Sequence, residues 1–232
     1  GAGTFTYGTS NLTMTGTSKK INYTGEETVY DLTINGTVTL NEIAGNNDGF
    51  MPKGDFTVGA SKTLSSTSTE SIVITDNSNT AIAIGSVDTS IAGLYKLRFR
   101  QSGSINLPAC TTPRVFLEVG TGNTVVATGD ITVTQELEVG SGLTFNANGN
   151  TIDVDILDIN GGTLDMRNSD FTIQSGGAVA WHDTSSTILS GNTTLTGYSS
   201  ANKADTYVPS AGNFEIVGDV KWLKLDAGAT DD

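Results

Sequence analysis

Pairs of apolar residues separated by a single residue recur through the second half of the chain at a short, nearly regular step. The pairs begin at Ile131, Leu137, Leu143, Val154, Leu164, Phe171 and Val179, mostly six to nine residues apart. A strand of three or four residues followed by a corner of similar length gives this step. Three such sides make a coil of about 20–25 residues, the repeat length of a β-solenoid. The spacing therefore predicts an all-β chain whose parallel coils stack at about 4.8 Å.

The composition favours the same architecture. Hydrophobic residues make up 36% of the chain and charged residues 16%, while glycine alone contributes 28 of the 232 residues. Glycine and asparagine gather between the apolar pairs, as in "GSG" (140–142), "NANGN" (146–150) and "NGG" (160–162). Sharp corners need residues that tolerate positive φ, and these two types do. We find no stretch with the apolar spacing of a helix, so we expect thin, repeated hydrophobic layers rather than helical packing.

The regularity of the rhythm divides the chain into four segments. We expect an N-terminal β segment (1–43), an irregular β region (44–114), a parallel β-helix or solenoid-like region (115–200) and a C-terminal cap (201–232). The irregular middle region has longer strands and a sandwich-like character. The alternative fold class is an antiparallel β-sandwich or jelly roll, which also consists of many strands with turn signals.

The net charge is −13, and it is unevenly distributed. Residues 1–114 hold 8 basic and 9 acidic residues, whereas residues 115–232 hold 4 basic and 16 acidic ones. Such a chain has little to neutralise phosphates, so we expect no nucleic-acid binding and no attraction to an anionic membrane. No apolar run approaches the roughly 20 residues that span a bilayer, so we also expect no membrane insertion.

Acidic residues alternate with apolar ones from residue 152 onward. If Val154 faces the core, its neighbours Asp153 and Asp155 face outward, because strand side chains alternate. Asp165 is expected to project outward from a neighbouring coil, which would stack carboxylates about 4.8 Å apart. Such a column favours a hard cation, so Asp153, Asp155 and Asp165 form a candidate Ca²⁺ site. The alternative is that these acids only solvate the outer face and discourage edge pairing.

Paired carboxylates about 5–10 Å apart could also cleave a polysaccharide. The groups that would assist them are scarce, since His182 is the only histidine and Trp181 and Trp222 are the only tryptophans. We interpret His182 as an outward neighbour of Trp181, and Cys110, the only cysteine, as a small buried apolar residue. We therefore expect no catalytic residues, no enzymatic activity and no cofactor other than Ca²⁺ at the acidic residues.

The stretch "LYKLRFR" (94–100) holds the only basic cluster of the chain. Lys96, Arg98 and Arg100 alternate with Leu97 and Phe99, so the charges share one strand face. One interpretation is a solvated strand face. The other is an interface, in which these three residues meet the acidic second half of a neighbouring subunit.

The Thr-, Asn- and Gly-rich rhythm of "NLTMTGTSKKINYTGEETVYDLTINGTVTL" (11–40) and "ITVTQELEVGSGLTFNANGNTIDVDILDINGGTLDM" (131–166) resembles two kinds of protein. One is the β-helical part of bacteriophage virion proteins, such as fibres, spikes and capsid-surface proteins. The other is bacterial surface adhesins of the filamentous or autotransporter type. The resemblance implies an extracellular, homo-oligomeric structural protein.

We therefore expect a structural protein at a virion or cell surface that acts through assembly. Its partners would be further copies of itself and other virion or surface proteins. The alternatives are a carbohydrate-binding or polysaccharide-cleaving β-helix, with a glycan as partner, and a calcium-stabilised adhesin.

Overall fold

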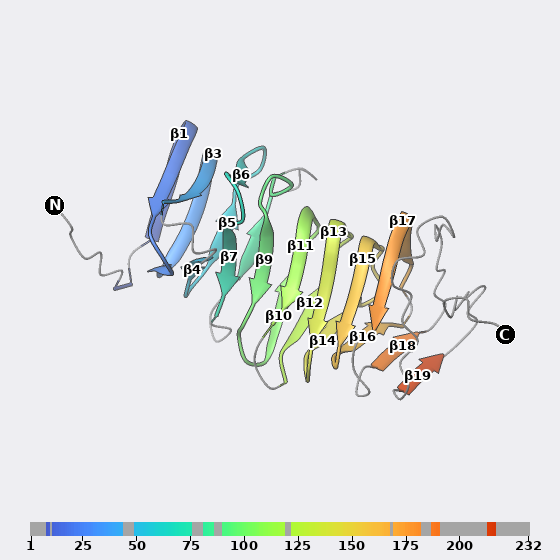
Figure 1. The fold of residues 1–232 in the computed structure, drawn as a ribbon. Helices are drawn as coiled ribbons and strands as arrows, with labels where there is room; N and C mark the ends of the chain where they lie inside the picture. The colour runs from blue at the N-terminus through green and yellow to red at the C-terminus, as the bar shows by residue number, and fades with distance from the viewer. Residues whose placement is uncertain are drawn as a thin grey trace.

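The computed structural model describes residues 8–9, 11–43, 49–75, 81–85, 90–118, 122–167, 169–181, 187–190 and 213–216, and the side chains among them up to Phe171. Every regular element in these ranges is a β-strand. The strands wind into a parallel β-solenoid of about seven turns, which forms an elongated stack (Figure 1). The predicted all-β solenoid is therefore confirmed.

The strands form three parallel sheets. The amino-terminal sheet consists of β1 (Asn11–Tyr23), β3 (Asp31–Glu42), β5 (Phe56–Val58), β6 (Thr63–Ser66) and β8 (Ile82–Ile84). The long sheet consists of β2 (Glu27–Val29), β4 (Gly49–Pro52), β7 (Ser71–Ile74), β9 (Lys96–Phe99), β11 (Cys110–Leu117), β13 (Ile131–Gly140), β15 (Ile152–Asn160) and β17 (Phe171–Trp181). The carboxy-terminal sheet consists of β10 (Ser104–Leu107), β12 (Thr124–Ala127), β14 (Thr144–Asn146), β16 (Thr163–Met166), β18 (Thr187–Ser190) and β19 (Asn213–Ile216).

The strand register shows how the apolar repeat builds the coil. Cys110 pairs with Ile131, Ile131 with Ile152, and Ile152 with Phe171, so equivalent positions recur at nearly equal intervals, once per coil. Strands β11, β13, β15 and β17 each contain a register shift near their middle. A bulge of this kind bends the strand. One long strand therefore follows two sides of the coil, and a strand of the carboxy-terminal sheet makes the third.

A single hydrophobic core extends along the inside of the coils. Phe56, Phe99, Phe145 and Phe171 are fully buried and come from coils that are widely separated in the sequence. Burial of one such side chain stabilises the fold by about 1.5–3 kcal/mol. The core is therefore built one layer per coil.

The solenoid begins earlier than the sequence rhythm indicates. Strands β4, β7 and β9 of the middle region lie in the same parallel sheet as β11 to β17, and all pairings between the described strands are parallel, unlike those of a sandwich. The middle coils are longer, because Ile72 pairs with Leu97 and Phe56 pairs with Ile82, each a wider interval than that from Ile131 to Ile152. The longer connections obscure the apolar repeat in the sequence of the middle region, but the strands there still wind as a parallel coil.

The predicted cap is only partly within the described residues. Strand β19 pairs in parallel with β18, with Phe214 beside Ile188. Residues 213–216 therefore extend the carboxy-terminal sheet by one strand. The rest of the 201–232 segment lies outside the described residues.

Several acidic side chains have a structural role at the corners. The Oδ1 atom of Asp31 accepts a hydrogen bond from the Asp55 backbone N–H at 2.8 Å, and Asp55 Oδ1 accepts one from Ala81 at 2.9 Å. At another corner, Asp130 Oδ1 accepts a hydrogen bond from the Thr151 backbone N–H at 2.9 Å. Each of these carboxylates links its coil to the following coil, so part of the acidity of the chain is explained by the fold.

Candidate functional site

The structure does not bring the three predicted metal ligands together. Asp153 and Asp155 lie on β15 in the long sheet, whereas Asp165 lies on β16 in the carboxy-terminal sheet. Asp153 is in register with Thr132 and Thr172, and Asp155 occupies the bulge of β15. The expected column of stacked carboxylates is therefore wrong, because a one-coil step from Asp153 leads to threonine. Nowhere in the described ranges do three His, Cys, Asp or Glu side chains gather to hold a metal ion.

Asp165 instead forms an ion pair with a neighbour in its own chain segment. Its Oδ1 and Oδ2 atoms accept hydrogen bonds from Arg167 Nε at 2.9 Å and from its terminal nitrogen at 2.7 Å. The Asp165 side chain is only 10% exposed, whereas that of Arg167 is 50% exposed. The hydrogen bonds from Arg167 hold the pKa of Asp165 below its ordinary value, against the opposing effect of burial. The carboxylate is therefore charged and compensated.

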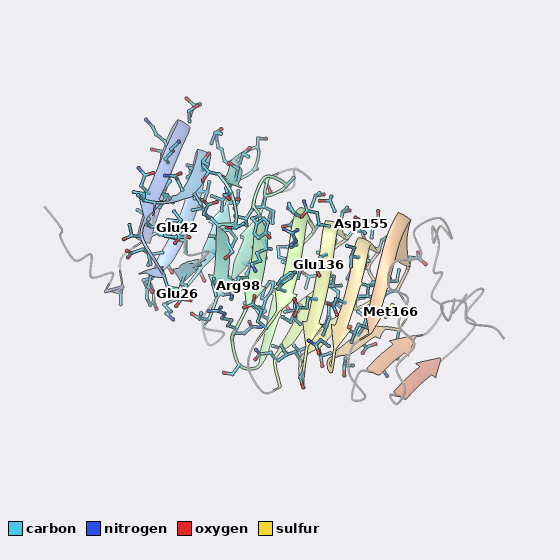
Figure 2. All side chains as sticks on the ribbon, in the orientation of Figure 1. Glu26, Glu42, Arg98, Glu136, Asp155 and Met166 are labelled. Atoms are coloured by element: carbon cyan, nitrogen blue, oxygen red, sulfur yellow. The ribbon has the colours of Figure 1, made fainter. Side chains whose placement is uncertain are left out.

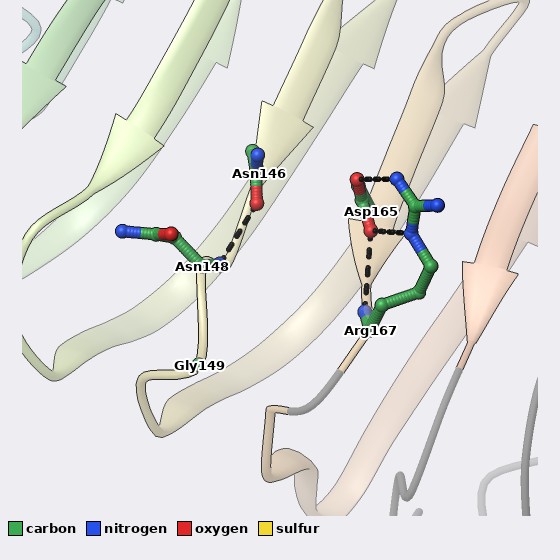
Figure 3. A pocket seen from close by; sticks show the side chains of 5 residues that line it. All are labelled: Asn146, Asn148, Gly149, Asp165 and Arg167. Carbon is green, nitrogen blue, oxygen red and sulfur yellow. Dashed lines mark hydrogen bonds and ion pairs between the residues drawn. The ribbon is translucent and has the colours of Figure 1, made fainter.

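This ion pair lines a hollow of about 460 Å³ on the outside of β14 and β16 (Figure 3). Asn146, Asn148 and Gly149 form the rest of its lining. Asn146 is in register with Asp165, and its Oδ1 atom accepts a hydrogen bond from the Asn148 backbone N–H at 2.8 Å. The lining is polar and contains a single carboxylate. The sequence signal for this hollow is the corner "NANGN", which we interpreted only as a turn.

The predicted basic cluster meets acidic partners within the same chain. Arg98 and one of these partners, Glu26, are labelled in Figure 2. Arg98 donates two hydrogen bonds to the carboxylate of Glu118, at 2.7 and 2.6 Å. Arg100 donates to Glu118 Oε2 at 3.1 Å and to Glu26 Oε1 at 3.0 Å, and Lys96 Nζ lies 3.8 Å from Glu118 Oε1. The expected complementarity of charge exists, but it joins coils of one chain: Glu118 lies on the coil after Arg98, whereas Glu26 directly precedes β2, three strands from β9 in the long sheet. These three residues therefore carry no argument for a contact between subunits.

The basic cluster belongs to a larger set of outward-facing charges, which we call the charged strip. It runs across β9, β11, β13 and β15 and consists of Lys96, Arg98, Arg100, Arg114, Glu118, Glu136, Glu138 and Asp158. Aromatic rings lie beside it: the Arg114 guanidinium is 4.3 Å from the centre of the Tyr95 ring, and Lys96 Nζ is 4.5 Å from that of Phe116. Such contacts between cations and rings are favourable.

The electrostatic environment of the strip changes along the solenoid axis. Burial alone would raise the pKa of Glu118, but the hydrogen bonds and charges of Arg98 and Arg100 hold it below its ordinary value. One coil further, Glu138 is in register with Asp158. Burial, and then the charge of Asp158, raises the pKa of Glu138 to about 7. At this acidic end of the strip, carboxylates therefore lie beside one another, whereas at the basic end each lies beside a cation.

Glu136 lies beside this pair on β13 and shows the same effect. Burial raises its pKa, the charge of Asp158 adds to the rise, and Arg114, whose Nε atom is 3.6 Å from Glu136 Oε2, opposes it. The sequence contained a signal for this cluster, because Arg98, Glu118, Glu138 and Asp158 recur at equal intervals close to the length of one coil.

The remaining residues discussed in the sequence analysis contribute no candidate site within the part of the chain that the structure describes. Cys110 is buried as expected, and burial raises the pKa of its thiol to about 12. Trp181 ends β17, and its side chain is not among those described. His182 and Trp222 lie outside the described residues.

No helix in the described ranges has the length and apolar character that a membrane span would need. No protein family, curated protein or solved structure matches the chain. Function must therefore be inferred from the fold and from the two surface features, the charged strip and the polar hollow.

Proposed function

We propose that this protein is a structural component of a virion or cell surface that acts through assembly and surface contacts. The observation that carries the proposal is the long sheet, in which eight strands from β2 to β17 stack without interruption. At about 4.8 Å per strand this stack extends for roughly 34 Å. A solenoid satisfies its backbone hydrogen bonds along this axis, and its stability is close to a sum of coil and neighbour terms. Such a rod suits a role as a spacer or support.

The use of charge on the long sheet also supports a structural role. Lys96 and Arg98 on β9, and Arg100 directly after it, are held by Glu118 and Glu26, so they reinforce the contacts between coils. In a site for chemistry we would expect such groups to converge on a cleft. Here they lie along a strand face and engage one another. On the same reasoning we propose that these charges are structural rather than catalytic.

The amino-terminal end of the rod favours further copies of the chain as partners. Among the described strands, β1 pairs only with β3, which leaves its other edge without a strand neighbour. Leu12 and Met14 on β1 are only partly buried, and Lys19 and Lys20 beside its bulge are exposed. A cationic end complements a chain whose second half is strongly acidic, so we propose end-to-end association. This contact would be heterologous.

Two measurements test the proposal. Sedimentation velocity of the purified chain across a concentration series should show reversible association that weakens with added salt. Immunogold labelling with an antibody to the chain should decorate the outside of intact particles or cells of the source. Labelling that appears only after lysis would contradict a surface role, and a monomer at every concentration and salt level would contradict end-to-end assembly.

Glycan recognition is the second candidate, and the polar hollow beside Asp165 is the observation that favours it. Glycoside hydrolysis by the usual mechanism needs two carboxyl groups about 5–10 Å apart. The hollow contains one, and Arg167 already engages it. Binding without cleavage is therefore the form of this candidate that the geometry supports.

A further inference from the structure

We propose that the hollow formed by Asn146, Asn148, Asp165 and Arg167 is a binding site for a neutral saccharide. The inference rests on the proposed function and deepens it, because it names the class of partner that a surface rod would contact here. The hollow of about 460 Å³ lies within the range of roughly 300–1,000 Å³ that small-molecule sites occupy. Its chemistry is set by one compensated ion pair and two amide side chains.

The ion pair selects against charged ligands. The Asp165 carboxylate is in direct contact with the Arg167 guanidinium, so the pair contributes no net charge to the hollow. A cation would have to approach the guanidinium, and an anion would have to approach the carboxylate. Breaking the ion pair between Asp165 and Arg167 costs free energy, because it would leave a partly buried charge without its partner. A neutral ligand can hydrogen-bond to the rim of the pair without disrupting it.

The two asparagines offer complementary hydrogen-bonding groups. The Oδ1 atom of Asn146 is used by the Asn148 backbone, which leaves the Asn146 amide hydrogens available. The Nδ2 atom of Asn148 donates to the Ala127 carbonyl at 3.2 Å, which leaves the Asn148 amide oxygen available. These are the only hydrogen bonds of the two side chains in the described part of the chain. A sugar hydroxyl both donates and accepts, so neighbouring hydroxyls match this donor and acceptor.

The side chains are held in place before a ligand arrives. Asn146 and Asp165 are register partners on adjacent strands, which fixes their separation. Asn148 is in the left-handed region, with φ of 51°, and Gly149 donates from its backbone N–H to Ser169 Oγ at 2.9 Å. Preorganisation of this kind removes part of the entropic cost of binding. Figure 3 shows these groups on two neighbouring coils, with the Asn148 side chain directed away from the Asp165–Arg167 pair, and all of them line the hollow.

The hollow lacks an aromatic ring in its described lining, so the expected affinity is low. We expect a dissociation constant of about 1 mM for a single sugar, as in weak recognition by hydrogen bonds alone. Repetition of the site along an assembled surface would raise the effective affinity by multivalency. The site therefore suits contact with a polymer or a dense glycan layer better than capture of a free monosaccharide.

Ligand-observed saturation-transfer NMR with a fixed panel tests the proposal. The neutral probes are the methyl glycosides of glucose, galactose, mannose and N-acetylglucosamine, and the charged counterparts are glucuronic acid and glucosamine. At least one neutral probe should bind with a dissociation constant of about 1 mM, and the charged counterparts should bind about tenfold more weakly or not at all. The proposal is overturned if no neutral probe binds at about 10 mM, or if a charged probe binds best.

Two variants and a matched control locate the binding. Asn148→Gly keeps the left-handed backbone and removes the amide, while Asp165→Asn keeps the shape and removes the charge. Each should weaken binding about tenfold. Asn106→Ala is the control, because Asn106 is an exposed outward residue of β10 in the same sheet, two coils away. Circular dichroism melting establishes that each variant is folded, and Asn148→Gly alone suffices if Asp165→Asn does not fold.

Binding that survives Asn148→Gly, or that is lost in Asn106→Ala, would also overturn the assignment. These outcomes leave the surface role intact, because immunogold labelling of whole particles does not depend on the hollow. Conversely, binding by the hollow in a protein found only inside cells would refute the proposed function without refuting the site.

Discussion

Replacement of Glu138 by glutamine should stabilise the protein at alkaline pH and leave it unchanged at acidic pH. Glu138 projects from β13 beside Asp158, with Glu136 and Glu118 close enough to contribute. Burial and these charges raise the pKa of Glu138 from 4.5 to about 7. Between these two values the folded chain holds the proton more tightly than the unfolded chain does. Stability therefore falls as the pH rises through this window, and the whole penalty is present above pH 7.

The size of the penalty follows from the same values. The difference between 4.5 and about 7 corresponds to about 3 kcal/mol, at 1.36 kcal/mol for each tenfold change in the ionisation constant. Glu138 is half-buried, so solvent screening reduces the effect to about 1–2 kcal/mol. Each kcal/mol shifts the melting temperature of a chain of this length by about 2–4 °C. We therefore expect Glu138→Gln to melt about 3–6 °C higher than the parent protein at pH 8.

The assay is thermal unfolding followed by circular dichroism at pH 8 and at pH 4.5, in the same buffer and salt. Two matched variants make the same change of net charge at other places. Asp153→Asn lies between threonines in the ladder and controls for total charge. Glu118→Gln removes the partner of Arg98 and Arg100 and should destabilise the protein at pH 8. Equal melting shifts for Glu138→Gln at the two pH values, or a rise for all three variants, would refute the reasoning.

Three further outcomes follow from the fold. Phe145→Ala, which empties a fully buried position, should lower the free energy of unfolding by about 3–5 kcal/mol in chemical denaturation, and a loss under about 1 kcal/mol would contradict the single core. Gly162→Ala should cost about 1–3 kcal/mol, because a Cβ there would lie 2.6 Å from the Gly140 carbonyl oxygen, and a neutral result would show that the coils can separate at this corner. EDTA should leave the melting temperature unchanged, because Asp153 and Asp165 lie on different sheets, and a drop on chelation would reveal a metal site.

The sequence predicted the winding and the core better than it predicted the surface. Ile131 and Ile152 repeat at the coil length, so their inward stacking follows from spacing alone. The middle coils do not follow this spacing, because the interval from Ile72 to Leu97 is wider. The apolar repeat therefore does not predict the winding there. An apolar side chain only has to face the core. Moving it along the sequence by one coil length leaves it facing the core. The middle region was therefore described too cautiously, as an irregular segment.

Surface pairs depend on the register itself. Lys96, Arg98 and Arg100 were correctly placed on one face, but their partner Glu118 lies on the following coil and becomes visible only when the coil length is known accurately. The predicted stacking of Asp153 and Asp165 was wrong for the same reason, because the chain turns to a different side of the coil within a short distance. The step that leads forward from Arg98 to Glu118 also leads from Glu138 to Asp158. Applying this step along the sequence would have found these four members of the charged strip.

Cys110, Ile131 and Ile152 begin β11, β13 and β15 at equal spacing along the sequence, so the chain advances in whole windings. Removing residues 131–151 would set Cys110 against Ile152, both of which face the core, and would leave the pairing of Leu107 with Ala127 unchanged. A loss or duplication of this size changes the height of the rod by one step of about 4.8 Å and leaves its cross-section as it was. Insertions and deletions in such a molecule are therefore expected to comprise whole coils rather than single residues. Relatives of different length would differ by multiples of one coil.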